Sequence, residues 1–208
     1  MGENGTGKST LFRCLAGLER YEGEIVTDHP IRIGHLPDTP YFYPLVTGKE
    51  FLDFCIKAGN VECSDKDIYQ LNELFNLPLN KFPSKYSLGM RKRLMVMALM
   101  LCPNDLYIMD ELFNGLDIAG VIILKKWINK RKQEGSSFLL SSHMISALTD
   151  TCDIVSYIYQ GRIIKTYLQG RITAEGIEQE LSLHMFHNVQ TFPESSRKET
   201  EQEEKVNN

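Results

Sequence analysis

The start of the chain carries residue types that could bind a phosphate group. Residues 2–9 read Gly-Glu-Asn-Gly-Thr-Gly-Lys-Ser and fit the P-loop pattern G-x-x-x-x-G-K-[ST]. The glycines permit backbone angles at which amide N–H groups point inward around an anion. We expect Lys8 to reach the β- and γ-phosphates of a nucleotide and the Ser9 hydroxyl to bind Mg²⁺. The candidate ATP-binding residues of this stretch are Gly2, Asn4, Gly5, Gly7, Lys8, Ser9 and Thr10.

A pair of acids later in the chain could do chemistry on a bound nucleotide. The apolar residues 106–109 predict a strand that ends in Asp110 and Glu111. This Walker B arrangement predicts that Asp110 holds Mg²⁺, directly or through water. Glu111 would orient and polarise an attacking water, a general-base role worth about 10²–10⁴ in rate. The alternative is a surface turn that happens to contain Asp-Glu, which the P-loop upstream disfavours.

Together these motifs resemble those of the nucleotide-binding subunit of an ABC transporter, of the antibiotic-export and bacitracin-resistance type. The resemblance extends to about Tyr167, with the motifs in the family's order. The family's signature, Leu-Ser-Gly-Gly-Gln, is here Tyr-Ser-Leu-Gly-Met at residues 86–90. Ser87 and Gly89 keep a hydroxyl and a backbone amide at a helix N-terminus, where both can bind a γ-phosphate. The resemblance therefore implies that Ser87 and Gly89 bind ATP.

The resemblance implies roles for three further positions. Residues 115–117, Gly-Leu-Asp, are similar to the loop that crosses to the other subunit of the dimer. His143 matches the switch histidine, which would bond the γ-phosphate and help to position the water beside Glu111. Asp38 stands where the family has a glutamine, and its carboxylate could reach Mg²⁺ through water. The catalytic residues implied are Glu111, His143 and Lys8; the metal ligands are Ser9, Asp110 and Asp38.

Alternating strand and helix patterns position these residues on an α/β fold. Strands are predicted at residues 24–26, 31–36, 106–110 and 138–142, and a hairpin at 154–167. The resemblance implies a P-loop fold of the ABC-ATPase type, in which helices flank a mostly parallel sheet and residues 47–102 form an inserted helical subdomain. We expect an ATPase domain over residues 1–170, an extension over 171–192 that includes a helix at 174–187, and a disordered polar tail over 193–208.

Composition limits the classes of partner. A net charge of −4 argues against nucleic acid as a partner. The longest apolar run, residues 94–102, is much shorter than the roughly 20 residues that span a membrane. Five widely spaced cysteines without a C-x-x-C pair indicate reduced thiols. We therefore expect a cytoplasmic protein, peripheral on the inner face of the membrane through a membrane permease subunit.

These features lead to one expected function and two alternatives. The expected function is that of an ATP-binding and ATP-hydrolysing subunit, homodimeric or heterodimeric, that uses ATP and Mg²⁺ to power a separate permease, with export as the expected direction. One alternative is a truncated or non-catalytic nucleotide-binding subunit. The other is a soluble ABC ATPase that does not act in transport, although such proteins usually carry a long insertion or a second ATPase domain.

The position of the P-loop predicts a missing element. A P-loop normally follows a buried strand, yet here it begins at residue 2. The family also has an aromatic residue upstream that stacks on adenine. We expect either a true start upstream of Met1 or a chain that has lost its N-terminal strands.

Overall fold

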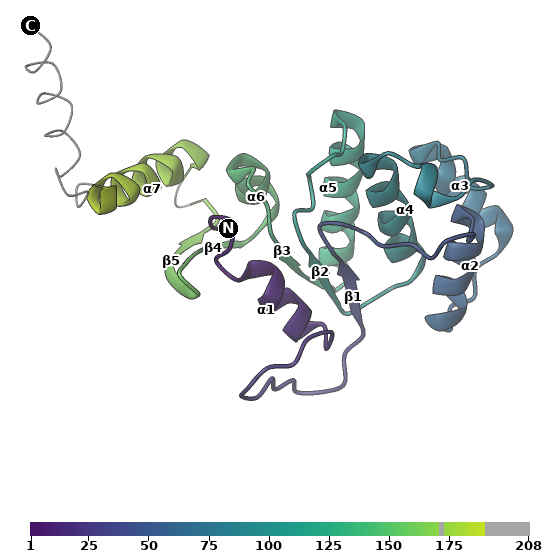
Figure 1. The fold of residues 1–208 in the computed structure, drawn as a ribbon, viewed down its shortest axis with the longest axis horizontal. Helices are drawn as coiled ribbons and strands as arrows, with labels where there is room; N and C mark the ends of the chain where they lie inside the picture. Colours follow the sequence, from purple (N-terminus) through teal and green to yellow (C-terminus); the bar gives the residue numbers. More distant parts are fainter. Residues whose placement is uncertain (171–172, 190–208) are drawn as a thin grey trace, which may run out of the picture. The chain divides into compact units, whose positions relative to one another are not determined.

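A parallel sheet lies at the centre of the structure, a computed structural model that describes residues 1–170 and 173–189. Its strands are β1 (Ile33–Leu36), β2 (Leu106–Met109) and β3 (Ser137–Leu140), in the order β1-β2-β3. β2 pairs in parallel with both neighbours (Figure 1). The predicted α/β class is confirmed, because helices separate these parallel strands along the chain.

Three helices, α1, α5 and α6, begin close to candidate site residues. α1 (Lys8–Leu15) follows Gly7 directly, so the P-loop leads into a helix N-terminus. α5 (Ile118–Gln133) begins after Asp117, whose carboxylate accepts a hydrogen bond from the Gly120 N–H at 2.8 Å. The short α6 (Ile145–Thr151) follows β3. All three helices begin shortly after candidate site residues.

Residues 47–102, for which the sequence predicts a helical subdomain, contain three α-helices. They are α2 (Gly48–Ala58), α3 (Asp65–Phe75) and α4 (Leu88–Leu101), with a short 3₁₀ helix, η1 (Pro83–Lys85), before α4. Thr47 caps α2 in a reciprocal pair with Glu50. Figure 1 shows these helices gathered beside the β1 edge of the sheet, away from β4 and β5.

The predicted hairpin is confirmed, but one predicted strand is wrong. β4 (Ile154–Tyr159) and β5 (Arg162–Leu168) form a separate two-stranded antiparallel sheet. Residues 24–26, which lie within the described part of the chain, form no strand. Ile25 is 40% exposed and Val26 75%, so this segment has no buried face to hold it against a sheet.

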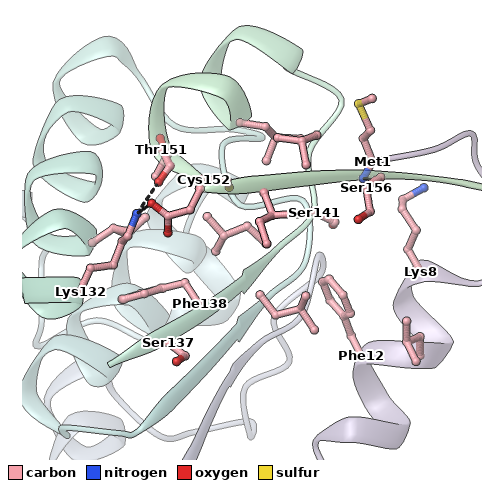
Figure 2. Close-up of a pocket in the computed structure, with 18 of the residues that line it drawn as sticks. Met1, Lys8, Phe12, Lys132, Ser137, Phe138, Ser141, Thr151, Cys152 and Ser156 are labelled. Carbon is pink, nitrogen blue, oxygen red and sulfur yellow. Dashed lines mark hydrogen bonds and ion pairs between the residues drawn. The ribbon is translucent and has the colours of Figure 1, made fainter. Parts of the chain in front are cut away.

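A groove separates the two sheets. It is lined by residues 137–141 on one side and by residues 154–156 on the other (Figure 2). Met1 and Lys8 lie at one end of it, so the groove leads into the P-loop. On the other side of β3 from the groove, β2 is largely buried. Its Tyr107 ring stacks on Phe138 of β3, with the ring centroids 4.8 Å apart.

The chain divides into two compact units, Met1–Arg171 and Ile172–Asn208. In the second unit, α7 (Ala174–Val189) confirms the helix predicted over residues 174–187. The predicted polar tail over residues 193–208 lies outside the described residues.

Candidate nucleotide-binding site

The P-loop adopts the backbone that its glycines allow. Gly5 and Gly7 have φ angles of 81° and 92°, a region that side chains other than glycine rarely adopt. The buried Lys8 lies within the loop, where its Nζ donates to the carbonyl oxygens of Gly2 at 2.7 Å and Glu3 at 2.8 Å. The Thr6 hydroxyl also donates to the Glu3 carbonyl. The ammonium group is thus held where a phosphate oxygen could replace a carbonyl as its partner.

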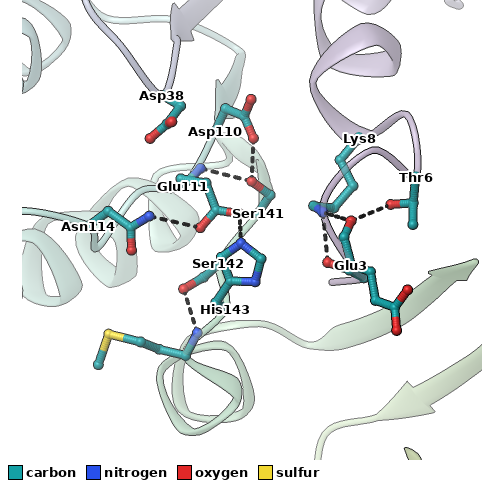
Figure 3. Close-up of polar contacts among 12 residues, drawn as sticks. Glu3, Thr6, Lys8, Asp38, Asp110, Glu111, Asn114, Ser141, Ser142 and His143 are labelled. Carbon is teal, nitrogen blue, oxygen red and sulfur yellow. Dashed lines mark hydrogen bonds and ion pairs between the residues drawn. The ribbon is translucent and has the colours of Figure 1, made fainter. Parts of the chain in front are cut away.

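Ser141 joins the two acids at the end of β2 to the end of β3. Its hydroxyl donates to Asp110 Oδ1 and accepts from the Glu111 N–H at 2.8 Å (Figure 3). Asp110 is only 4% exposed, so this hydrogen bond offsets part of the cost of burying its carboxylate. Glu111 has a φ of 45°, an uncommon backbone conformation for a side-chain-bearing residue. Such conformations cluster at functional sites.

Glu111 and His143 are in contact. His143 Nε2 lies 3.2 Å from Glu111 Oε1, and Asn114 Nδ2 donates to Glu111 Oε2 at 3.3 Å. His143 is held there by a turn in which the Met144 N–H donates to the Ser142 hydroxyl at 2.9 Å. Both carboxylate oxygens of Glu111 therefore have a partner, which fixes the orientation of the group. Figure 3 shows this cluster on one side and Lys8 with its loop on the other.

A second histidine, His35, lies on the strand next to β2 and interacts electrostatically with Asp110. His35 belongs to β1, which pairs with β2 so that His35 is opposite Ile108. Burial lowers the pKa of the His35 imidazole, and the nearby Asp110 carboxylate opposes this shift only in part. We therefore expect His35 to be neutral at pH 7, so that it adds no positive charge beside Asp110.

Asp38 has a cationic partner, Lys92, on α4, the helix that follows the signature residue Ser87. Its Oδ1 lies 3.0 Å from Nζ of Lys92, which also donates to the Glu111 main-chain oxygen at 2.7 Å. The Lys92 side chain is fully buried, whereas Asp38 is half exposed. A buried charge needs such partners. One oxygen of Asp38 is thus already engaged, and its role as a metal ligand stays a prediction.

The signature segment contacts the loop after the Walker B acids. Ser87 caps α4, and its hydroxyl accepts from the Met90 N–H at 3.2 Å. A Cβ at Gly89 would lie 2.2 Å from the Gly115 carbonyl oxygen, so only glycine fits this contact. Arg93 pairs with Asp117, the cap of α5, at 3.1 Å. The contacts of Ser87 and Gly89 are therefore with α4 and the 115–117 loop.

A comparison with known protein families matches residues 1–114 to the ABC transporter family. The chain belongs to that family. It is 30% identical to the ABC-type transporter ATP-binding protein EcsA of Bacillus subtilis (strain 168) over 178 residues, which cover 78% of this chain and 72% of EcsA. It is 29% identical to the bacitracin transport ATP-binding protein BcrA of Enterococcus faecalis, over 79% of this chain and 58% of BcrA.

A solved structure supports the same assignment. It is described as the ATP-binding subunit of an ABC transporter and is 25% identical to this chain, with a TM-score of 0.76. The match covers 88% of this chain and 86% of the solved chain. The predicted family and the P-loop ABC-ATPase fold are confirmed by these matches.

Three residues of this ABC-family site were not singled out from the sequence. From the sequence, Ser141 is indicated only as part of the strand at residues 138–142, and no pattern indicates Asn114 or Lys92. Asn114 lies three residues after Glu111 in a tight turn, a spacing that could have indicated it. Lys92 and Asp38 are 54 positions apart. No short-range pattern could have paired them.

Proposed function

We propose that this chain is the ATP-binding and ATP-hydrolysing subunit of an ABC transporter and that it powers a separate membrane permease. The observation that carries the proposal is the contact between Glu111 and His143. A carboxylate whose two oxygens contact Asn114 and His143, at the end of a strand in a P-loop fold, is suited to act on water rather than to stabilise the surface.

The residues present fit ATP with Mg²⁺. Among the described residues, no group of three or more His, Cys, Asp or Glu side chains could hold a metal ion. Mg²⁺ is commonly held by one or two protein oxygens together with substrate phosphates. Ser9 and Asp110 are the proposed protein ligands, with Asp38 as a third candidate. When bound, the ion would neutralise charge on the phosphates.

The chain's own groups account for binding and for water activation. Lys8 and the amide groups of the P-loop bind phosphate oxygens. Glu111 accepts a proton from the attacking water, and His143 keeps the carboxylate directed toward that water. His143 is about half exposed on the open side of the site, where it can also bond a phosphate oxygen. Both groups come from the ends of strands, which are rigid supports for a site.

A second ATPase subunit would complete the site. Ser87 and Gly89 belong to the helical region and contact the 115–117 loop. In the proposed dimer, homomeric or heteromeric, these two residues of one copy bind the phosphates held by the P-loop of the other copy. ATP then closes the dimer through charge-assisted hydrogen bonds, and hydrolysis reopens it.

An apolar groove next to α2 is the proposed contact with the permease. It has a volume of about 320 Å³ and is lined by Phe42, Tyr43, Leu45, Val46, Glu50, Phe51 and Phe54. Phe54 is 64% exposed and Leu45 80%, and apolar patches of this kind mark interaction sites. None of the described helices is long and apolar enough to cross a membrane. The proposed location is the cytoplasmic face of the membrane, with the permease as anchor.

Export is the proposed direction of transport. The signature variant Tyr-Ser-Leu-Gly-Met resembles that of antibiotic-export systems. A relative named for export, the SkfA peptide export ATP-binding protein SkfE of Bacillus subtilis (strain 168), is 28% identical to this chain over 79% of the chain and 74% of SkfE, and it supports the same direction.

A His143→Ala variant tests the proposed chemistry. We expect ATP turnover to fall about 100-fold, because Glu111 loses the group that orients it. ATP binding should change by less than about tenfold. His29→Ala is the matched control, since His29 is exposed and lies in the loop before β1, away in sequence from Glu111 and His143. Wild-type protein that binds ATP but shows no turnover, even with its permease in vesicles, would instead support a non-catalytic subunit.

A further inference from the structure

The loop after β1 keeps Asp38 in a restricted position. The Asp110 N–H donates to the Leu36 carbonyl at 2.8 Å, so the end of β1 is bonded to the end of β2. Pro37 and Pro40 lie on either side of Asp38. Because proline fixes its own φ angle and restricts the residue before it, this short loop has few alternative conformations. The Asp38 carboxylate is therefore presented to one region beside the strand ends.

Lys92 is a cation without access to solvent. Its side chain is fully buried on α4. The Nζ atom donates to Asp38 Oδ1 at 3.0 Å and to the Glu111 main-chain oxygen at 2.7 Å. Taking an ammonium group out of water is costly, and a neutral carbonyl offsets only part of that cost. The charge of Lys92 therefore requires the carboxylate of Asp38.

The same carboxylate cannot bind Mg²⁺ without weakening this pair. A metal ion at Asp38 would lie close to the Lys92 ammonium, and like charges repel most strongly where water is excluded. Withdrawal of the carboxylate would leave a buried cation without its anionic partner. In Figure 3, the acids at the end of β2 lie between Asp38 and Lys8, the residue proposed to bind phosphate. These observations favour Lys92 over a metal ion as the partner of Asp38.

Glu111 depends on this pair through its backbone. Lys92 binds the Glu111 carbonyl, and the Ser141 hydroxyl binds the Glu111 N–H at 2.8 Å. The φ angle of 45° at Glu111 is costly for a residue with a side chain, and such angles persist only where surrounding contacts hold them. Without Asp38, the Lys92 ammonium would move toward solvent and release the Glu111 carbonyl.

We propose that Asp38 is a positioning residue, which neutralises Lys92 so that Lys92 holds the Glu111 backbone, and that Asp38 does not ligate Mg²⁺. This role removes Asp38 from the proposed metal ligands and leaves Ser9 and Asp110. The kinetic consequence rests on the proposed ATPase function, whereas the ion pair is tested in the protein without nucleotide.

A double-mutant cycle in the nucleotide-free protein tests the ion pair. Asp38→Ala should lower the melting temperature by about 4 °C or more, because it leaves the Lys92 cation buried without its anion. The double variant with Lys92→Met should be as stable as Lys92→Met alone, since no cation remains for Asp38 to neutralise. Asp38→Asn takes the place of Asp38→Ala if the alanine variant does not fold. The control cycle uses Asp150→Ala and Lys125→Met, a surface pair whose single changes should each shift the melting temperature by less than about 2 °C.

A titration with Mg²⁺ separates a positioning role of Asp38 from a role as metal ligand. The readout is the binding of a fluorescent ATP analogue at rising Mg²⁺ concentration, which requires no hydrolysis. Asp38→Ala should change the half-saturating Mg²⁺ concentration less than about twofold, whereas Asp110→Asn should raise it at least about tenfold.

Steady-state kinetics measure the effect on Glu111. Asp38→Ala should lower turnover about tenfold while the KM for ATP stays near its wild-type value, because Glu111 is misplaced and the phosphate-binding groups are intact. Adding Asp38→Ala to Lys92→Met should lower turnover no further, since both changes act through the same bond to Glu111.

Two results would overturn the proposal. If Asp38→Ala raised the half-saturating Mg²⁺ concentration as much as Asp110→Asn does, Asp38 would be a metal ligand. Additive losses of stability in the double variant would show that Asp38 and Lys92 act independently. If the wild-type protein shows no ATP turnover, the proposed function fails, while the melting and Mg²⁺ experiments still decide the role of Asp38.

Discussion

At the scale of single residues, Lys92 connects three parts of the site. It is a fully buried cation on α4, held by the Asp38 carboxylate and the Glu111 main-chain oxygen. The Glu111 backbone is in turn fixed by Ser141, and its side chain by His143 and Asn114. Lys92 therefore supports the proposed general base without contacting the reacting atoms.

Lys92→Met tests this supporting role. The change leaves a buried carbonyl at Glu111 without its partner, so we expect the free energy of unfolding to fall by about 1–3 kcal/mol. ATP turnover should also fall, with little change in ATP affinity. Urea denaturation and steady-state kinetics measure the two effects. Lys125→Met is the control, since Lys125 pairs with Asp150 at the surface and should cost less than about 1 kcal/mol.

The contact between α4 and the 115–117 loop matters at the scale of the elements. Gly89 packs directly on the Gly115 carbonyl, and Arg93 of the same helix pairs with the cap of α5. The signature helix and α5 are thus linked through one short loop. In the proposed dimer, this link would join the phosphate bound by the signature to the Walker B acids of the same copy.

Gly89→Ala should disrupt that link. An added methyl group would overlap the Gly115 oxygen, and the strain should cost about 1–3 kcal/mol of stability. We also expect a protein that carries both Gly89→Ala and Glu111→Gln to form no dimer with ATP, whereas Glu111→Gln alone forms one; size-exclusion chromatography measures the difference. Leu88→Ala is the control, because Leu88 is 42% exposed and its truncation creates no overlap. Normal stability and normal dimer formation in Gly89→Ala would contradict the assigned contact.

Local signals in the sequence were sufficient for most elements. Apolar residues followed by two acids predicted β2, and the pattern over residues 154–167 predicted the hairpin of β4 and β5. The strand at residues 24–26 was predicted wrongly because a run of three residues, of which only Ile25 and Val26 are apolar, carries no information about whether a neighbouring strand is present. The Asp38–Lys92 pair was missed because it depends on a contact between distant segments. Within the site, the ends of β2 and β3 could be located from the sequence, but the hydrogen bonds between them could not.

At the scale of the whole molecule, the proposed permease groove is separate from the strand ends that carry the acids. Phe54→Glu places a charge in this groove without touching the site residues. We expect ATP binding and the melting temperature to stay near wild-type values, because Phe54 is 64% exposed. Binding to vesicles that contain the permease should fall at least tenfold, since a charge would be desolvated in an apolar contact.

The control for the groove is Tyr69→Glu, an exposed aromatic residue on α3 outside it. A co-sedimentation assay with vesicles measures both variants. Equal loss of binding in Phe54→Glu and Tyr69→Glu would show that the groove is not the contact with the permease.

Glu111→Gln shows whether Glu111 activates water for ATP hydrolysis. The amide keeps the shape of the side chain and can still contact Asn114 and His143, but it cannot accept a proton. Glu134→Gln is the matched control at the surface end of α5. We predict that Glu111→Gln binds ATP with near-normal affinity while turnover falls at least about 100-fold, and that Glu134→Gln behaves as wild type. Near-normal hydrolysis by Glu111→Gln would contradict the account.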